Sequence, residues 1–196
     1  PEACLALAKR LRAEGYDFRL DMIGNGPLEE QLRQQIQQEG LSDCVRLLGS
    51  MKPEQVRQHM ENAGIFLFTS DFGEGWGAVL NEAMNSGCAV VASHAIGATP
   101  YLVADGENGL IYKNGDTQDL CQKVKSLLED SEKRRQLGLQ AYETMADLWN
   151  PETAAQRLVE LARRILSGET MPECYEDGPC SRARILENNW YRSTME

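Results

Sequence analysis

The chain has 196 residues, of which 42% are hydrophobic, and its 30 acidic and 20 basic residues give a formal net charge of -10. This length suffices for one sizeable domain with its own core. The acidic balance argues against a nucleic-acid partner, because neutralising phosphates requires clustered Lys and Arg. No run approaches the roughly 20 apolar residues that span a bilayer, and no signal peptide is evident at Pro1, so we expect a cytoplasmic protein.

Short apolar runs alternate with longer helical patterns along the chain. The runs are residues 18–23, 45–48, 65–68, 89–92 and 110–112. Each is too short for a core helix and is flanked by Gly, Asn or Asp, which predicts buried strands of a parallel sheet. The alternation predicts an α/β fold with a doubly wound, Rossmann-like parallel sheet and helices on both faces. Ligands of such sheets bind beyond the carboxyl ends of the strands.

Apolar side chains at helical spacing fill the gaps between these runs, and we expect them to pack in the core. They are Leu28, Leu32 and Ile36, then Leu120, Val124 and Leu127, and finally Leu158, Leu161 and Ile165. The last helix is predicted to begin at the cap Asn150, followed by Pro151, and to stop at Gly168.

The six cysteines give no metal-site pattern, because none belongs to a Cys-x-x-Cys pair and only two histidines accompany them. Cys88 lies in an apolar run and Cys121 on a helical stripe, so both are expected to be core residues. The sequence leaves open whether Cys174 and Cys180 pair. The whole pattern favours a reducing compartment.

The most informative segment runs from Ser70 to Gly87 and follows the apolar run 65–68. It contains Glu74-Gly-Trp-Gly77 and then a predicted helix from about Ala78. Glycines let the backbone approach a ligand closely. The free amides of Gly77, Ala78 and Val79 at the helix start favour an anion such as diphosphate. The Glu82 carboxylate can accept two hydrogen bonds from a vicinal diol such as a ribose.

This segment resembles the signature of glycosyltransferase family 4, in which two Glu residues are separated by seven residues. The likeness extends over roughly residues 3 to 166, which makes chance unlikely. Further matching segments are Met22-Ile-Gly-Asn-Gly-Pro27, Val45-Arg-Leu-Leu-Gly49, Ala89-Val-Val-Ala92 and Asp105-Gly-Glu-Asn-Gly109. The resemblance implies the carboxy-terminal, donor-binding half of a GT-B fold. We expect residues 1–167 to form that domain, without its first strand, and residues 168–196 to form a tail that either packs on the other half or is mobile.

The resemblance also implies roles for individual residues. Glu74 would hold the donor sugar and is the expected catalytic residue, whereas Glu82 would hold the ribose. Met51 would contact the base, and Gly24 and Gly26 would let the first loop pass close to the donor. Backbone groups from Gly75 and Trp76 to Gly77, Ala78 and Val79 would complete the donor site, with the last three amides on the diphosphate. We expect Trp76 itself to pack and shape the loop.

Members of this family transfer a sugar from a nucleotide-diphosphate sugar to an acceptor with retention at the anomeric carbon. We accordingly expect a hexosyltransferase that needs no cofactor and no metal, since the chain has no Asp-x-Asp. The implied acceptor is a polysaccharide or a glycolipid, and a lipid-linked acceptor would bring the enzyme to the inner face of the membrane.

The chain departs from the family pattern at its start, because Pro1 already lies in the helix after the usual first strand. An Arg and a Lys that stabilise the leaving diphosphate, and the amino-terminal acceptor domain, are therefore expected to be missing. We expect this chain alone to be inactive, and its exposed sheet edge to favour self-association. At Tyr101 many relatives carry Glu, and we expect a surface packing residue there.

Two other functions remain open from the sequence. One is a non-catalytic module that binds a nucleotide sugar. The other is a different GT-B-like enzyme, an epimerase or a phosphorylase. The presence of both Glu74 and Glu82 counts against a retired site, and neither a cofactor lysine nor an inorganic phosphate site is evident for a phosphorylase.

Overall fold

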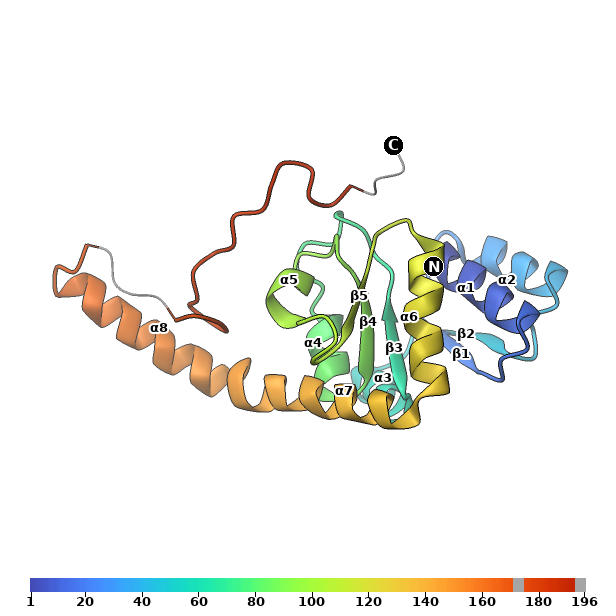
Figure 1. Cartoon of the computed structure of the whole chain (residues 1–196), viewed down its shortest axis with the longest axis horizontal. Coiled ribbons are helices and arrows are strands. Elements are labelled where there is room, and N and C mark those ends of the chain that lie inside the picture. Colours follow the sequence, from blue (N-terminus) through green and yellow to red (C-terminus); the bar gives the residue numbers. More distant parts are fainter. Residues whose placement is uncertain (171–174, 193–196) are drawn as a thin grey trace.

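The computed structural model describes residues 1–170 and 175–192. Its strands are β1 (Leu20–Ile23), β2 (Val45–Gly49), β3 (Ile65–Phe68), β4 (Ala89–Ser93) and β5 (Leu110–Tyr112). Its helices are α1 (Glu2–Ala13), α2 (Glu29–Gln38), α3 (Pro53–Asn62), α4 (Val79–Asn85), α5 (Thr99–Leu102), α6 (Thr117–Glu129), α7 (Ser131–Glu143), a π-helical turn η1 (Thr144–Leu148) and α8 (Pro151–Leu166). The alternation of strands and helices confirms the α/β class (Figure 1).

The strands form two parallel sheets within the described residues. One sheet is β1-β2 and the other is β3-β4-β5. β1 and β2 are in register from Leu20 opposite Val45, and β3 and β4 from Ile65 opposite Ala89. The sheets share no strand pair, so β1 and β3 each keep an unpaired edge.

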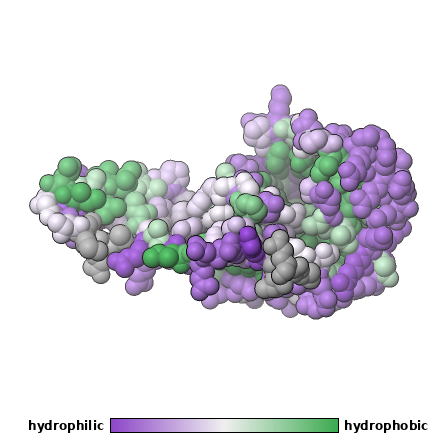
Figure 2. All heavy atoms as spheres, turned by 90° about the horizontal axis from the view of Figure 1, so that it is seen from above, coloured by the Kyte–Doolittle hydropathy of each residue, from purple (hydrophilic) through white to green (hydrophobic). Residues whose placement is uncertain are grey.

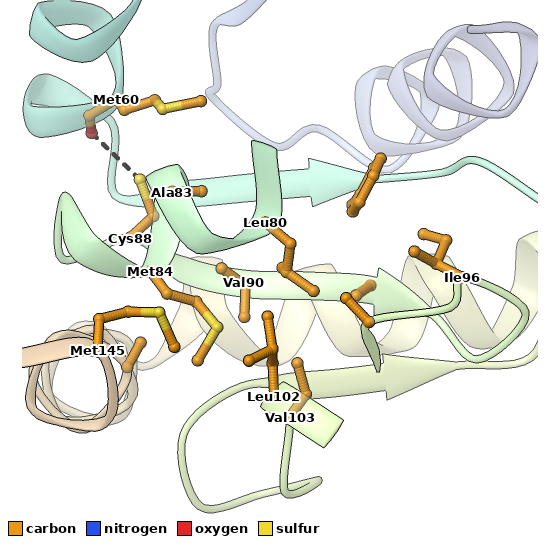
Figure 3. Packing of buried hydrophobic residues seen from close by; sticks show 14 residues of the cluster. Met60, Leu80, Ala83, Met84, Cys88, Val90, Ile96, Leu102, Val103 and Met145 are labelled. Atoms are coloured by element: carbon orange, nitrogen blue, oxygen red, sulfur yellow. Dashed lines mark hydrogen bonds between the residues drawn. The ribbon is translucent and has the colours of Figure 1, made fainter. Parts of the chain in front are cut away.

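Both faces of the three-stranded sheet are covered by apolar side chains. Val90 and Ala92 of β4 pack in a cluster with Met60 of α3 (Figure 3). Ala89 and Val91, which alternate with them, pack in a second cluster with helices α1, α6 and α7. Because successive side chains of a strand point to opposite faces, helices lie on both sides of the sheet. This arrangement agrees with the predicted layers.

The sequence predicted that Cys88 and Cys121 are core residues, and the structure confirms both predictions. Cys88 and Cys121 are buried in the core. The Cys88 thiol donates to the Met60 carbonyl at 3.2 Å (Figure 3), and burial raises its pKa to about 11. Cys180 is a half-buried free thiol. The possible partner Cys174 lies outside the described residues.

Helix α8 corrects one prediction. It begins as expected, with the Asn150 side chain accepting the N–H of Thr153 at 2.8 Å and Pro151 at the first position. Its apolar stripe, however, does not pack in the core, since Leu158 is 59% and Ile165 53% exposed. The helix projects from the sheets (Figure 1), and hydrophobic residues gather at its far end (Figure 2). Helical spacing identifies an apolar face but not what covers it.

No helix within residues 1–170 and 175–192 combines the length and the hydropathy required to cross a bilayer.

Candidate functional site

The loop 70–77 connects the carboxyl end of β3 to the start of α4. A turn at Asp71 shapes its first half. The Asp71 carboxylate accepts the N–H of Gly73 at 2.8 Å, and the Asp71 carbonyl accepts the N–H of Glu74 at 3.0 Å. A side chain that accepts from the backbone two residues on is a common way to fix a tight turn. Glu74 therefore leaves this turn from a defined backbone position.

The second half of the loop rests against the segment that follows β4. Gly97 donates its N–H to the Glu74 carbonyl at 3.5 Å, and Ala98 donates to the Trp76 carbonyl at 3.1 Å. The contact is so close that a Cβ built on Gly97 would lie 1.6 Å from the carbonyl oxygen of Gly75. Only glycine at position 97 allows the two loops to meet in this way.

Gly77 sets the point at which α4 starts. Its φ of +80° lies in the left-handed region, and a Cβ there would lie 2.6 Å from the ring of Phe68 at the end of β3. Glycine adopts this conformation without a steric penalty. The chain therefore turns directly over the end of β3 and enters α4 at Val79.

The first amides of α4 are available to a ligand. No hydrogen bond among the described residues engages the N–H groups of Gly77, Ala78 or Val79. The next amide, of Leu80, already donates to the Gly77 carbonyl at 2.9 Å. Free amides at a helix start carry partial positive charge and suit an anion.

Both candidate carboxylates are also unengaged. Glu74 is half-buried on the loop, and Glu82 is exposed in the first turn of α4. Within the described part of the chain, no hydrogen bond or ion pair involves either side-chain carboxylate. A carboxylate only accepts hydrogen bonds when ionised, so both can receive hydroxyl donors from a ligand.

The ends of β1 and β2 contribute the glycine loop and Met51. Gly24 has a φ of +127°, and its N–H donates to the Gly49 carbonyl at 2.9 Å, which ties the two strand ends together. Gly24, Met51 and Val79 line one cavity. The other predicted residues lie outside that lining: Gly26, Glu74, Gly75, Trp76, Gly77, Ala78 and Glu82.

Trp76 takes part in an aromatic group beside the loop. Its indole N–H donates to the Asn81 side-chain oxygen at 2.9 Å. Its ring centroid lies 5.8 Å from that of Tyr101 and 5.7 Å from that of Trp149. The indole thus packs on two rings, and Tyr101 is half-buried in the same group. A role of Trp76 toward a ligand stays a prediction.

The tail returns to this edge, which the sequence did not predict. The Asn114 N–H donates to His94 Nδ1 at 2.9 Å, and His94 Nε2 lies 3.0 Å from the Trp190 carbonyl. Because Nδ1 accepts, a neutral imidazole carries its proton on Nε2 and donates it to Trp190. The neighbouring Tyr191 packs on Phe72 of the loop. The aromatic pair Trp190-Tyr191 was the signal in the sequence that could have indicated this contact.

On the β1 side of the cavity, the carboxylate of Asp21 pairs with the guanidinium of Arg46. Its carboxylate accepts from Arg46 Nε at 2.7 Å and from Arg46 Nη2 at 2.6 Å. This bidentate hydrogen bonding lowers the pKa of Asp21. His59 Nδ1 lies 3.5 Å from the same carboxylate. The group therefore stays ionised at neutral pH.

Across residues 1–170 and 175–192, no three side chains from His, Cys, Asp and Glu come together closely enough to hold a metal ion.

Comparison with known proteins identifies the family that this chain matches. The family model described as glycosyl transferases group 1 matches residues 1–144. The amylovoran biosynthesis glycosyltransferase AmsK of Erwinia amylovora is 31% identical over 170 residues, which are 84% of this chain and 40% of that protein. The chain thus spans less than half the length of this relative.

Two solved structures support the fold. The carboxy-terminal domain of the glycosyl transferase group 1 protein LpcC from Francisella tularensis has a TM-score of 0.66 and 26% identity, covering 74% of this chain and 76% of that one. The Anabaena protein HepE, solved in complex with UDP, has a TM-score of 0.69 and 28% identity, covering 80% of this chain and 44% of that one. These neighbours are GT-B glycosyltransferase domains, as the resemblance implied.

Proposed function

Because the chain belongs to the glycosyl transferases group 1 family, we propose that residues 1–167 bind the nucleotide-diphosphate sugar donor of a retaining glycosyltransferase. The observation that carries the proposal is the meeting of two elements at one sheet edge. The amides of Gly77, Ala78 and Val79 are free, and Val79 lines a cavity that Gly24 and Met51 also line. Structural neighbours solved with UDP support a nucleotide as the ligand.

The donor would lie across the carboxyl ends of the strands. Its diphosphate faces the amides of Gly77, Ala78 and Val79, where helix-end charge stabilises it. Its ribose hydroxyls donate to Glu82. Its base reaches Met51, which is half-buried at the cavity. Gly24 and Gly26 keep side chains out of the path of the donor.

Glu74 would receive hydroxyls of the donor sugar. Its backbone is held by the Asp71 turn and by Gly97, so the carboxylate is presented from a fixed loop. When the glycosidic bond to the diphosphate breaks, negative charge grows on the leaving group. Prepositioned amides at the start of α4 lower the energy of that charge without reorganising. This role does not call for a metal ion.

Residues 1–196 alone would bind donor but not turn it over. The acceptor, by family resemblance a polysaccharide or a glycolipid, would bind a second domain. The chain spans 40% of AmsK. Sugar transfer by this chain alone would overturn that part of the proposal.

The test is ligand-observed NMR on the chain with UDP, GDP and ADP and their sugar adducts. We expect one nucleotide to bind with a Kd of about 1 mM, roughly 4 kcal/mol. Glu82→Gln should weaken binding about tenfold, because a hydrogen bond to a charged group contributes about 1.5–3 kcal/mol. Glu152→Gln, in the first turn of α8, is the matched control and should bind as the unmodified chain does.

Either of two results would contradict the proposal. If no nucleotide binds, the cavity edge is not a donor site. If Glu82→Gln binds as tightly as Glu152→Gln, the ribose role is wrong. Repeating the titration with EDTA checks the metal-free expectation, since chelation should leave the Kd unchanged.

A further inference from the structure

The tail, in its described residues 175–192, is fastened to helix α8 near its start. The Tyr175 hydroxyl donates to the Glu160 carboxylate of α8 at 2.6 Å. The guanidinium of Arg157, also on α8, lies 4.2 Å from the centre of the Tyr175 ring. The same guanidinium donates to the Pro179 carbonyl at 3.3 Å. From this attachment the tail runs back toward the sheet (Figure 1).

The middle of the tail lies in solvent. Residues 182–189 are all exposed, and the side chain of Ile185 is 100% exposed. A turn closes this stretch, because the Trp190 N–H donates to the Glu187 carbonyl at 3.1 Å. Within the turn Asn189 has a φ of +66°, a left-handed conformation that Asn tolerates better than most residues. Beyond this turn the chain lies against the end of the sheet.

The end of the tail meets His94, whose position does not depend on the tail. The His94 backbone N–H donates to the Tyr112 carbonyl of β5 at 3.0 Å. Its Nδ1 accepts the Asn114 N–H at 2.9 Å. Both partners belong to the end of β5 and the loop after it, so the imidazole is oriented without the tail. Its Nε2 is thereby directed to the Trp190 carbonyl, 3.0 Å away.

Tyr191 contacts the donor loop at Phe72, inside the turn that precedes Glu74. Asp71 builds this turn by accepting the N–H groups of Gly73 and Glu74. Phe72 is one of the two middle residues of the turn, and its ring centroid lies 4.3 Å from that of Tyr191. Even with this contact Phe72 is 59% exposed. The tail therefore packs directly on the turn that sets the position of Glu74.

The end of the tail also bridges two segments that hold Glu74. His94 follows β4 in the same segment as Gly97, whose N–H donates to the Glu74 carbonyl at 3.5 Å. Trp190 contacts this segment, whereas Tyr191 contacts the turn before Glu74. Because the two aromatic residues are consecutive, one short piece of backbone ties the segment to the turn.

The tail leaves the donor side of the loop open. None of its described residues lines the cavity that Gly24, Met51 and Val79 line. The amides at the start of α4 also remain free while the tail is in place. The closed tail is therefore compatible with a bound donor, which favours a tail that supports the loop over one that blocks the site.

We propose that Trp190 and Tyr191 form a latch that positions Glu74. The closed latch restrains the Asp71 turn, so that the Glu74 carboxylate is held where the donor sugar binds. Tyr191 is thus a positioning residue that acts through Phe72. The sugar contact of Glu74 rests on the proposed function, whereas ordering of the loop by the latch does not depend on any ligand.

The first test compares variants of residues 1–196 by amide hydrogen exchange, read by NMR as magnetisation transfer from water. Tyr191→Ala should speed exchange at Gly73 and Glu74 by about threefold to tenfold, because losing an aromatic pair favours the open loop by about that factor. Tyr191→Phe keeps the ring and should exchange as the unmodified chain does. Ile185→Ala, in the exposed middle of the tail, is the matched control.

A second measurement connects the latch to the donor. The Kd values for UDP and UDP-glucose are compared between Tyr191→Ala and Ile185→Ala. Because Glu74 is proposed to receive sugar hydroxyls, Tyr191→Ala should raise the Kd for UDP-glucose about threefold and leave the Kd for UDP unchanged. A general loss of structure would instead weaken both ligands equally.

Several outcomes would overturn the latch. If exchange at Gly73 and Glu74 is equal in Tyr191→Ala and Ile185→Ala, the tail does not order the loop. If Tyr191→Ala binds UDP-glucose more tightly, the tail blocks the site. If both ligands weaken equally, the latch does not position Glu74. If the unmodified chain binds neither ligand, the donor-site proposal is wrong, and the exchange result alone decides whether the latch orders the loop.

Discussion

The ring of Tyr191 packs on the ring of Phe72, with centroids 4.3 Å apart and planes inclined by 31°. Trp190 stands edge-on to His94, with ring centroids 6.4 Å apart. The first contact lies on the loop between β3 and α4, and the second lies after β4. The tail is thus held at the edge of the sheet where the donor is proposed to bind.

Replacing Tyr191 by Ala should release the tail. An aromatic pair contributes about 0.5–1.5 kcal/mol beyond its buried area, and cleavage of an opened segment follows the population of the open form. Trypsin cleavage after Arg182 and Arg184, followed by mass spectrometry, should accelerate about threefold to tenfold. Tyr142→Ala is the control, since no ring contact involves Tyr142 among the described residues. Equal rates for the two variants would show that the Phe72 contact does not hold the tail.

Gly97→Ala should disturb the donor loop. The new methyl would lie 1.6 Å from the Gly75 carbonyl oxygen, so the loop has to move. Overpacking of this kind costs about 1–3 kcal/mol, which urea unfolding would measure. Gly75→Ala tests the opposite side of the same contact, and nothing lies within 4 Å of its Cβ. If Gly97→Ala is as stable as Gly75→Ala, the two loops do not meet as described.

Gly138→Ala should destabilise the chain although it lies inside helix α7. Elsewhere in a helix this change stabilises by about 1 kcal/mol. Here the added Cβ would lie 2.2 Å from the Gly87 carbonyl oxygen, where α7 approaches the start of β4. We expect a loss of about 1–3 kcal/mol in the free energy of unfolding. The adjacent Leu139→Ala, at a 44% exposed position, should change little. A more stable Gly138→Ala variant would contradict the packing of α7.

The free energy of unfolding should fall in acid, in part because the carboxylate of Asp21 becomes protonated. Its pKa is lowered by Arg46 relative to the ordinary value of 3.8, so the unfolded chain binds more protons in that range. The contribution is present above pH 3.8 and is lost as pH falls through the lower folded pKa. Because the Arg46 side chain is 44% exposed, solvent screens the pair and its contribution to stability is small. Urea midpoints between pH 2 and 6 should drop less for Asp21→Asn than for the Asp17→Asn control, which removes a carboxylate that forms no ion pair with any described residue.

The sequence predicted the elements well because buried parallel strands and capped helices leave local signals. All five apolar runs became strands, with β1 beginning at Leu20 rather than at Phe18. The prediction that each strand is buried holds throughout for β4 alone, since the other four each keep half-buried or exposed residues. The cap at Asn150 and the turn at Gly77 were likewise legible from residue type. Features that depend on contacts between residues far apart in the sequence could not be predicted in this way. Periodicity could not show that Leu158 lacks a covering layer.

The candidate site likewise has some features that local sequence indicates and others that depend on distant contacts. The two Glu residues and the glycines around Trp76 stand together in the sequence, so their loop could be identified. The support from Gly97 comes from the far side of β4, and the Trp190 carbonyl arrives from the tail. Such contacts depend on tertiary packing, and no spacing of residues in the sequence indicates them. The break between the sheets also appears only once strand pairing is known.

The divided sheet has a consequence for how the chain melts. The cluster around β1 and β2 and the two clusters around β3, β4 and β5 have no strand ladder in common. Helix α1 and Phe18 link them: Leu5 and Ala8 pack in the first cluster, Leu7 and Leu11 pack in another, and Phe18 packs against both. Cooperativity between the halves therefore depends on side-chain packing rather than on a shared strand ladder, and calorimetry should record a van't Hoff enthalpy below the calorimetric one. A chain with this construction melts as two coupled foldons rather than as one.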